Sequence, residues 1–116
     1  MKLLIATLAL AFSTATSAKL STTEMFEFCE NLAGNAATIQ DGRRTGVTPT
    51  PSSALALHKR VIDGMLSRGE INTKTAEILT DRHVGLVAIV FEYDHFVSPD
   101  YVFKLLLNEC IVSNRR

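Results

Sequence analysis

The fold of this chain is decided by its first long amphipathic segment, which reads STTEMFEFCENLAGNAATIQDGRRTG at residues 21–46. Ser21 and Glu24 have the spacing of a capping box, and the glutamates of the first turns suit the positive end of a helix dipole. From Met25 onward, apolar residues recur at steps of three and four, which predicts a helix with one buried face. That face carries Met25, Cys29, Leu32, Ala36, Ile39 and Arg43, flanked by Phe28 and Ala33.

The first helix has two candidate stops. Gly46 stands where a left-handed residue would end it, and Gly42 is the rival. Residues 48–51 then read Thr-Pro-Thr-Pro, and each proline lacks an amide hydrogen and disfavours helical geometry in the residue before it. The sequence therefore predicts a loop over residues 48–51.

A second helix is predicted to start at a cap on Ser52 or Ser53 and to reach about Arg68. Gly69 lies just beyond its expected end, and Gly64 is its weak point. The inward side chains expected from the spacing are Leu55, Val61, Ile62, Met65 and Leu66.

A third helical segment is predicted over residues 72–93, capped by Asn72 or Thr73. Thr80-Asp81 and Gly85 could divide it, so one helix and two helices both remain open. Residues 84–91 are almost all apolar, and by propensity alone they could form a buried strand. We favour a helix, because the chain has no second β-rich segment to pair with a strand, and unpaired backbone groups in a core are costly.

The last helix is predicted by Ser98-Pro99, which reads as an N-cap followed by proline at the first helical position. We expect this helix to run from Tyr101 to about Ser113, with Cys110 on one face together with Phe103, Leu106 and Leu107.

The N-terminus and the two cysteines indicate the compartment. Residues 1–18 combine Lys2, an uncharged apolar run and small residues at the expected cleavage point, which predicts a secretory signal peptide. The mature chain would then be periplasmic or secreted, where Cys29 and Cys110 can oxidise to each other. A redox pair or intermolecular disulfides are the alternatives, but the two cysteines lack a C-x-x-C spacing.

Residues 19–116 are short enough for one domain with a modest core. The predicted fold is all-α, a small bundle of about four helices whose first and last helices are linked by the disulfide.

Composition excludes several classes of protein. The twelve basic and twelve acidic residues balance, so nothing attracts nucleic acid or an anionic membrane surface. The chain has no Trp and only two Tyr, which argues against an aromatic platform for sugars or bases. No apolar segment after the signal peptide is long enough for stable membrane insertion.

The histidines do not predict a metal site. Ligands on one helix should be three or four residues apart, and His58 and His83 have no His, Cys or Asp at such an offset. Glu92, Asp94 and His95 form a denser group, which we interpret as a solvated turn. Both cysteines are assigned to the disulfide and no serine lies in a Gly-x-Ser-x-Gly elbow, so we expect no enzyme activity, no metal and no cofactor.

Residues 41–46, Asp-Gly-Arg-Arg-Thr-Gly, superficially suggest a phosphate-binding loop. They lack the spacing of a P-loop and no strand precedes them. Arg43 and Arg44 are better explained as cations near a helix C-terminus, with contact to a partner protein as the alternative.

The spacing of Cys29, Ala33, Ala36, Arg43 and Gly46 resembles that of small secreted proteins of bacteria and their phages, a largely uncharacterised group with a Cys-x3-Ala-x2-Ala opening followed by Arg-x2-Gly. The C-terminal part is similar to theirs as well, in Ile89-Val90, Tyr93, Pro99, Phe103 and Cys110.

The resemblance implies an exported helical protein with a disulfide between its first and last helices, and it implies no catalytic residue. The chain departs from the group at Asp94-His95-Phe96, where an Ala-Tyr and then a Pro turn is more typical, so the resemblance does not define this turn.

Two functions follow as hypotheses. The first is a periplasmic protein-binding module that inhibits or modulates another periplasmic or envelope protein, with Arg43, Arg44, His95 and Phe96 as candidate contact residues near predicted helix ends. The second is a periplasmic chaperone of the acid-stress type, whose core loosens when native-state carboxylates are protonated.

Overall fold

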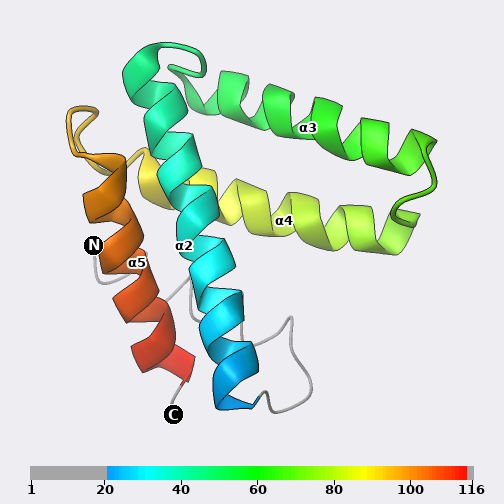
Figure 1. The fold of residues 1–116 in the computed structure, drawn as a ribbon. Coiled ribbons are helices and arrows are strands. Elements are labelled where there is room, and N and C mark those ends of the chain that lie inside the picture. The colour runs from blue at the N-terminus through cyan, green and yellow to red at the C-terminus, as the bar shows by residue number, and fades with distance from the viewer. Residues whose placement is uncertain (1–20, 115–116) are drawn as a thin grey trace.

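The computed structural model describes residues 21–114, so the signal peptide predicted for residues 1–18 lies outside the described residues. The described chain forms four helices and no strand, which confirms the all-α prediction (Figure 1). The helices are α2 (Thr22–Thr45), α3 (Pro51–Ser67), α4 (Thr73–Val90) and α5 (Pro99–Asn114).

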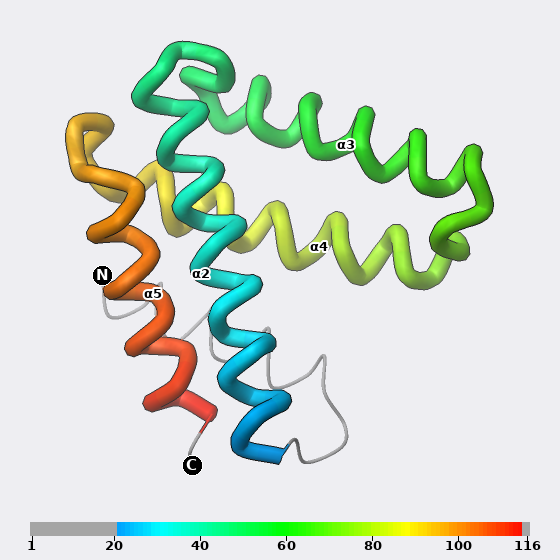
Figure 2. Tube along the Cα trace, viewed as in Figure 1, coloured from blue at the N-terminus to red at the C-terminus, as the bar shows by residue number. Residues whose placement is uncertain are grey.

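The helices form two antiparallel pairs, as Figure 1 and Figure 2 show. In one pair α2 and α5 lie side by side, and in the other α3 and α4 make a hairpin that runs across the direction of α2. The hairpin projects to one side of the α2–α5 pair and is joined to it through contacts between α2 and α4. This arrangement leaves α3 on the outside, packed mainly against α4.

Helix α2 begins and ends as its sequence predicts. The Ser21 hydroxyl accepts from the Glu24 amide at 3.1 Å, and the Glu24 carboxylate accepts from the Ser21 amide at 3.2 Å, so the capping box is complete. These hydrogen bonds to Ser21 lower the pKa of Glu24. At the other end Gly46 has φ of 82°, a left-handed conformation that terminates the helix.

Gly42, the other candidate stop, lies inside α2 and does not end the helix. The loop after α2 folds back over this glycine. The Thr48 amide donates to the Gly42 carbonyl at 3.0 Å, and a methyl group at residue 42 would collide with the Thr48 hydroxyl. Gly42 is therefore a site of close approach between the helix and the following loop.

The core lies where α2, α4 and α5 meet. Small residues at Ala33 and Ala36 let the neighbouring helices approach α2 closely, and Leu86, Val90 and Leu106 fill the space between them. The predicted stripe on α2 is confirmed at Cys29, Leu32, Ala33, Ala36 and Ile39, which are buried. Met25, Phe28 and Arg43 are only partly buried, and Gln40 is buried although it was not predicted.

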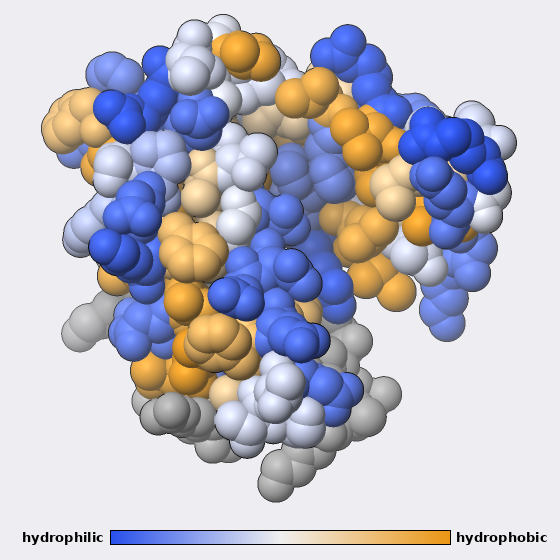
Figure 3. All heavy atoms as spheres, viewed as in Figure 1, coloured by the Kyte–Doolittle hydropathy of each residue, from blue (hydrophilic) through white to orange (hydrophobic). Residues whose placement is uncertain are grey.

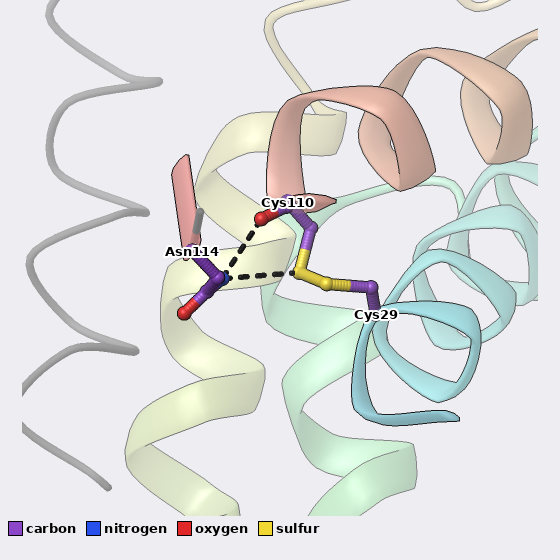
Figure 4. Close-up of a disulfide and its surroundings, with 3 residues drawn as sticks. All are labelled: Cys29, Cys110 and Asn114. Atoms are coloured by element: carbon purple, nitrogen blue, oxygen red, sulfur yellow. Dashed lines mark hydrogen bonds between the residues drawn. A yellow bond between two sulfur atoms is a disulfide. The ribbon is translucent and has the colours of Figure 1, made fainter. Parts of the chain in front are cut away.

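The disulfide between α2 and α5 is present as predicted (Figure 4). Cys29 and Cys110 have Cα atoms 5.6 Å apart, and both side chains are buried in the core. The Asn114 side-chain amide donates to the Cys110 carbonyl at 2.8 Å and lies 3.6 Å from the Cys110 sulfur. The bridge joins the two ends of the described chain across the core.

Helix α3 starts earlier than predicted. Thr50 is its N-cap and Pro51 its first residue, so the prediction of a cap at Ser52 or Ser53 and of a loop through residue 51 was wrong. Proline fits the first helical position because its missing amide hydrogen has no intrahelical partner there. Ser53 occupies the third position and closes a capping box with Thr50, through hydrogen bonds of 3.0 and 3.1 Å.

Residues 73–90 form one helix, which settles the choice between one helix and two, but the predicted end at residue 93 was wrong, because the helix stops at Val90 with Phe91 as its C-cap. Asn72 caps it by accepting from the Thr75 amide at 2.8 Å, and the helix continues through Gly85. The preference for helix over strand in residues 84–91 is confirmed for residues up to Val90. At α5, the Ser98 hydroxyl accepts from the Tyr101 amide at 3.1 Å, as its N-cap reading predicts.

One predicted core position on α3 is exposed. Ile62 is buried, but Val61 is 53% exposed, because α3 packs mainly against α4. The face of α3 that turns away from α4 therefore keeps apolar side chains in solvent.

Candidate functional site

Two histidines that are far apart in the sequence meet between α3 and α4. The rings of His58 and His83 are stacked, with centroids 3.7 Å apart and planes inclined by 4°. His58 belongs to α3 and His83 to α4, so the stack is part of the contact that holds the hairpin together. We call it the imidazole pair.

Burial keeps the imidazole pair neutral. Desolvation lowers the pKa of His58, and the Leu79 backbone opposes this shift only in part. Desolvation together with the neighbouring His58 lowers the pKa of His83 to about 4, against the opposing effect of the Ala54 backbone. Both rings are therefore uncharged at pH 7, and a proton on either ring would place a cation against its neighbour.

The stacking geometry does not suit a shared metal ion. Imidazole lone pairs lie in the ring plane, and the planes of two parallel rings do not meet at one point between them. Among residues 21–114, no group of three or more His, Cys, Asp or Glu side chains is placed to hold a metal ion.

A cavity of about 380 Å³ lies beside the imidazole pair, between the C-terminal half of α2 and α3. Figure 3 shows the surface hollowed between α2 and the α3–α4 hairpin. Ile39 and Ala54 form part of its lining, together with the two histidines, and Asp41 supplies a charge. We call this cavity the α2–α3 groove.

The α2–α3 groove has an apolar rim. Val47 is 71% exposed, Leu57 41% and Val61 53%, and all three line the groove. They come from the α2–α3 loop and from the free face of α3. Large aliphatic side chains that gather around a concave surface are typical of a site where another molecule binds.

The structure gives Arg43 an internal role. Its guanidinium lies 4.8 Å from the centre of the Phe91 ring and donates hydrogen bonds to the carbonyls of Val90 and Tyr93. Val90 is the last residue of α4, and Tyr93 lies in the turn that follows it. Arg43 therefore stabilises the end of another helix, rather than its own, and is only partly exposed.

The other three predicted contact residues are at the surface. Arg44 and His95 are exposed, and Phe96 is 68% exposed with its ring at 5.9 Å and a steep angle to the His95 ring. Their contact with a partner stays a prediction. The turn that carries His95 and Phe96 is held from inside by Gln40 on α2, whose side-chain amide donates to the Val97 carbonyl at 2.7 Å.

The sequence analysis did not predict that Gln40 holds the turn before α5, or that His58 and His83 pack against each other. Gln40 is fully buried, and its side-chain nitrogen also lies within hydrogen-bonding distance of the Asp94 and His95 carbonyls. The usable signal was a polar residue on an apolar stripe, with Gln40 four residues after Ala36. The same signal marks His83, which follows Leu79 by four residues.

Comparison of this chain with protein families, with curated protein sequences and with solved structures finds no match. Between residues 21 and 114, every helix is too short or too polar to pass through a lipid bilayer.

Proposed function

We propose that this protein is an exported, periplasmic binding module that inhibits or modulates another periplasmic or envelope protein. The observation that carries the proposal is the α2–α3 groove, a cavity of about 380 Å³ with Val47, Leu57 and Val61 exposed on its rim. Exposed aliphatic side chains cost free energy in water, and covering them with an apolar partner recovers it.

Export is supported by the chain's disulfide and its N-terminal sequence. A buried disulfide fits an oxidising compartment, and residues 1–18 have the pattern of a signal peptide. In that compartment the bridge keeps α2 and α5 in place, while the α3–α4 hairpin, which contains neither cysteine, forms one wall of the groove.

The shape of the groove favours an apolar helix or loop of the partner as its occupant. Two helices form its walls, and apolar side chains line them, which is the arrangement used when an amphipathic helix binds in a groove. Polar side chains at Asn35, Thr38 and Asp41 border the same cavity and provide acceptors and donors at its edge.

The test is capture of partners from the cells that make the protein, by crosslinking a tagged chain and identifying the products. The variant Leu57→Asp/Val61→Asp places two charges on the groove, while Arg44→Ala/His95→Ala/Phe96→Ala alters the second candidate surface. We expect the wild type and the second variant to capture the same envelope protein, and the groove variant to lose it. Capture that survives in the groove variant would contradict the proposal. Circular dichroism and an intact disulfide serve as folding controls.

The imidazole pair favours one second candidate, a periplasmic chaperone of the acid-stress type. Its two neutral rings lie at the α3–α4 contact, so acid would protonate them and weaken the hairpin. Circular dichroism from pH 7 to pH 2 separates this candidate from the first, because a chaperone that works by loosening must lose ordered structure in acid. Full retention of helix over that range would rule it out.

A further inference from the structure

A second cavity, of about 260 Å³, lies on α2 and α4 next to the α2–α3 groove. The two cavities share Asn35 and both rings of the imidazole pair. The second cavity extends toward the N-terminal half of α2 and is lined there by Asn31 and, from α4, by Arg82. We call it the Arg82 cavity.

The Arg82 cavity has positive charge and no acidic side chain in its lining. Arg82 is its one permanently charged group, and the amides of Asn31 and Asn35 and the imidazole pair supply the remaining polar atoms. Within residues 21–114 Arg82 makes no ion pair, and its guanidinium carbon lies 5.3 Å from the centre of the Phe28 ring. An arginine that is partly buried without a counter-ion leaves room for an anion.

Unpaired nitrogens mark the same place. Four buried side-chain polar atoms in residues 21–114 lack a hydrogen-bond partner, and three of them are Nε of Arg82 and Nε2 of His58 and His83. The fourth is Oε1 of Gln40, which does not belong to this cavity. Buried polar groups are nearly always hydrogen-bonded, and the Nε of an arginine always carries a hydrogen, so the unpaired Nε–H of Arg82 indicates a missing acceptor in this cavity.

The rest of the lining is apolar. Phe28, Leu32, Leu79 and Leu86 surround the cavity, and these side chains offer no hydrogen bonds to an inorganic ion or its hydration water. We propose that the Arg82 cavity binds a small organic carboxylate, with its oxygens on the Arg82 guanidinium and its hydrocarbon part against these four side chains. The carboxylate can come from a free acid or from the C-terminus of a polypeptide.

Binding should be coupled to protonation. The titratable or charged groups that line the two cavities around the imidazole pair are Asp41 from α2 and Arg82 from α4. A carboxylate in the Arg82 cavity adds a negative charge near His58 and His83 and favours their protonated forms. By thermodynamic reciprocity, lowering the pH must then raise the affinity of the Arg82 cavity for the carboxylate.

The experiment is a ¹H–¹⁵N nuclear magnetic resonance titration of the oxidised protein at pH 7 and pH 5.5. Isovalerate is the probe for a free acid, N-acetyl-leucine the probe for a chain end, and isovaleramide the uncharged control. We expect saturable shifts at the Arg82 Nε–H and at the Asn31 and Asn35 side chains with either acid, larger affinity at the lower pH, and no saturation with the amide. The acid that binds with the higher affinity shows whether the natural carboxylate is a free acid or a polypeptide C-terminus.

The matched variants are Arg82→Gln, which removes the cation, and Arg68→Gln, which removes an exposed arginine paired with Glu70. Loss of a charge-assisted hydrogen bond predicts an affinity about tenfold or more lower for Arg82→Gln, and no change for Arg68→Gln. Equal responses to isovalerate and isovaleramide in the wild type would overturn the proposal, whether or not Arg82→Gln folds. Saturation by inorganic phosphate alone would overturn it too. Capture of a partner at the α2–α3 groove is measured separately, so either proposal can fail alone.

Discussion

Two polar side chains on α2 hold the end of α4 and the turn that follows it. Gln40 donates from a fully buried amide to carbonyls of the turn, and Arg43 donates to the carbonyl of Val90, the last residue of α4, and to that of Tyr93 in the turn. Both replace hydrogen bonds that the backbone cannot make where a helix ends and the chain reverses. At the residue scale, they fix the position of α5 relative to α4.

Replacing Gln40 should therefore be costly. Gln40→Ala leaves the Val97 carbonyl without its donor inside the protein, so we expect the free energy of unfolding to fall by about 1–3 kcal/mol. Thr38→Ala, on the exposed face of the same helix, is the matched control and should change it by less than about 0.5 kcal/mol. Urea unfolding at pH 7 measures both, and equal effects would contradict the role given to Gln40.

The imidazole pair should make stability depend on pH. The folded-state pKa of His83 is about 4 and its ordinary value is 6.5, so the unfolded chain binds more protons between these values. Stability is thus fully present above pH 6.5 and is lost as the pH falls toward 4. Because both rings are partly exposed, screening reduces the expected loss to about 1–2 kcal/mol.

Urea unfolding at pH 7.5 and pH 4.5 checks this, with His58→Phe/His83→Phe as the variant that keeps stacked rings without titration. The variant should lose less stability on acidification than the wild type does. His95→Phe, at an exposed position, should behave like the wild type. If all three proteins lost the same stability between pH 7.5 and pH 4.5, groups other than the imidazole pair would be the cause.

At the scale of the element, two glycines of α2 have opposite roles. Gly34 has open space around it, while Gly42 is covered by Thr48. Gly34→Ala should therefore raise the free energy of unfolding by about 0.5–1 kcal/mol, since alanine favours helix. Gly42→Ala should lower it, because its methyl group must displace the Thr48 side chain. Thermal unfolding of the two variants is the measurement, and stabilisation by both would contradict the close approach of the loop.

The disulfide joins α2 to α5 across a sequence separation of 81 residues. By the loop-entropy relation, removing it should cost about 4 kcal/mol, a large part of the stability of a domain this size. We expect Cys29→Ser/Cys110→Ser to lower the urea midpoint strongly or to unfold at 37 °C. Asn108→Ser, an exposed change on α5, is the control. A double variant with wild-type stability would show that packing alone holds the two helices.

Local signals explain which elements could be predicted. The capping box at Ser21 and the Ser98-Pro99 start are patterns of a few neighbouring residues. The disulfide could be predicted because the chain has only two cysteines. The predicted start of α3 was wrong because Pro49 and Pro51 were both interpreted as helix breakers, although Pro51 suits the first turn of a helix.

The candidate site was not predictable in the same way. His58 and His83 meet only because α3 and α4 form a hairpin, and their separation in sequence carries no signal for that contact. Val61 was expected in the core because its spacing matches a buried face, but no helix covers that side of α3. Which helix covers which face is a property of the tertiary arrangement.

At the scale of the whole molecule, a disulfide-linked pair of helices carries a hairpin that stands off to one side (Figure 2). The α2–α3 groove exists because α3 packs on α4 and leaves its other face open toward α2. Ile39 and Ala54 belong to both the core and the groove, but the rim residues Leu57 and Val61 lie outside the core, so the rim can be altered without removing core side chains. This separation makes the proposed docking surface testable by substitution.

Site-specific photocrosslinking in the producing cells tests the docking proposal most directly. A photoreactive amino acid at Leu57 would stand on the groove rim, and the same amino acid at Val112 would stand at an exposed position on α5. We expect one discrete crosslinked product with an envelope protein from residue 57 and none from residue 112. The same products from both positions, or none from residue 57 in the folded, oxidised protein, would contradict the claim that the α2–α3 groove is the binding surface.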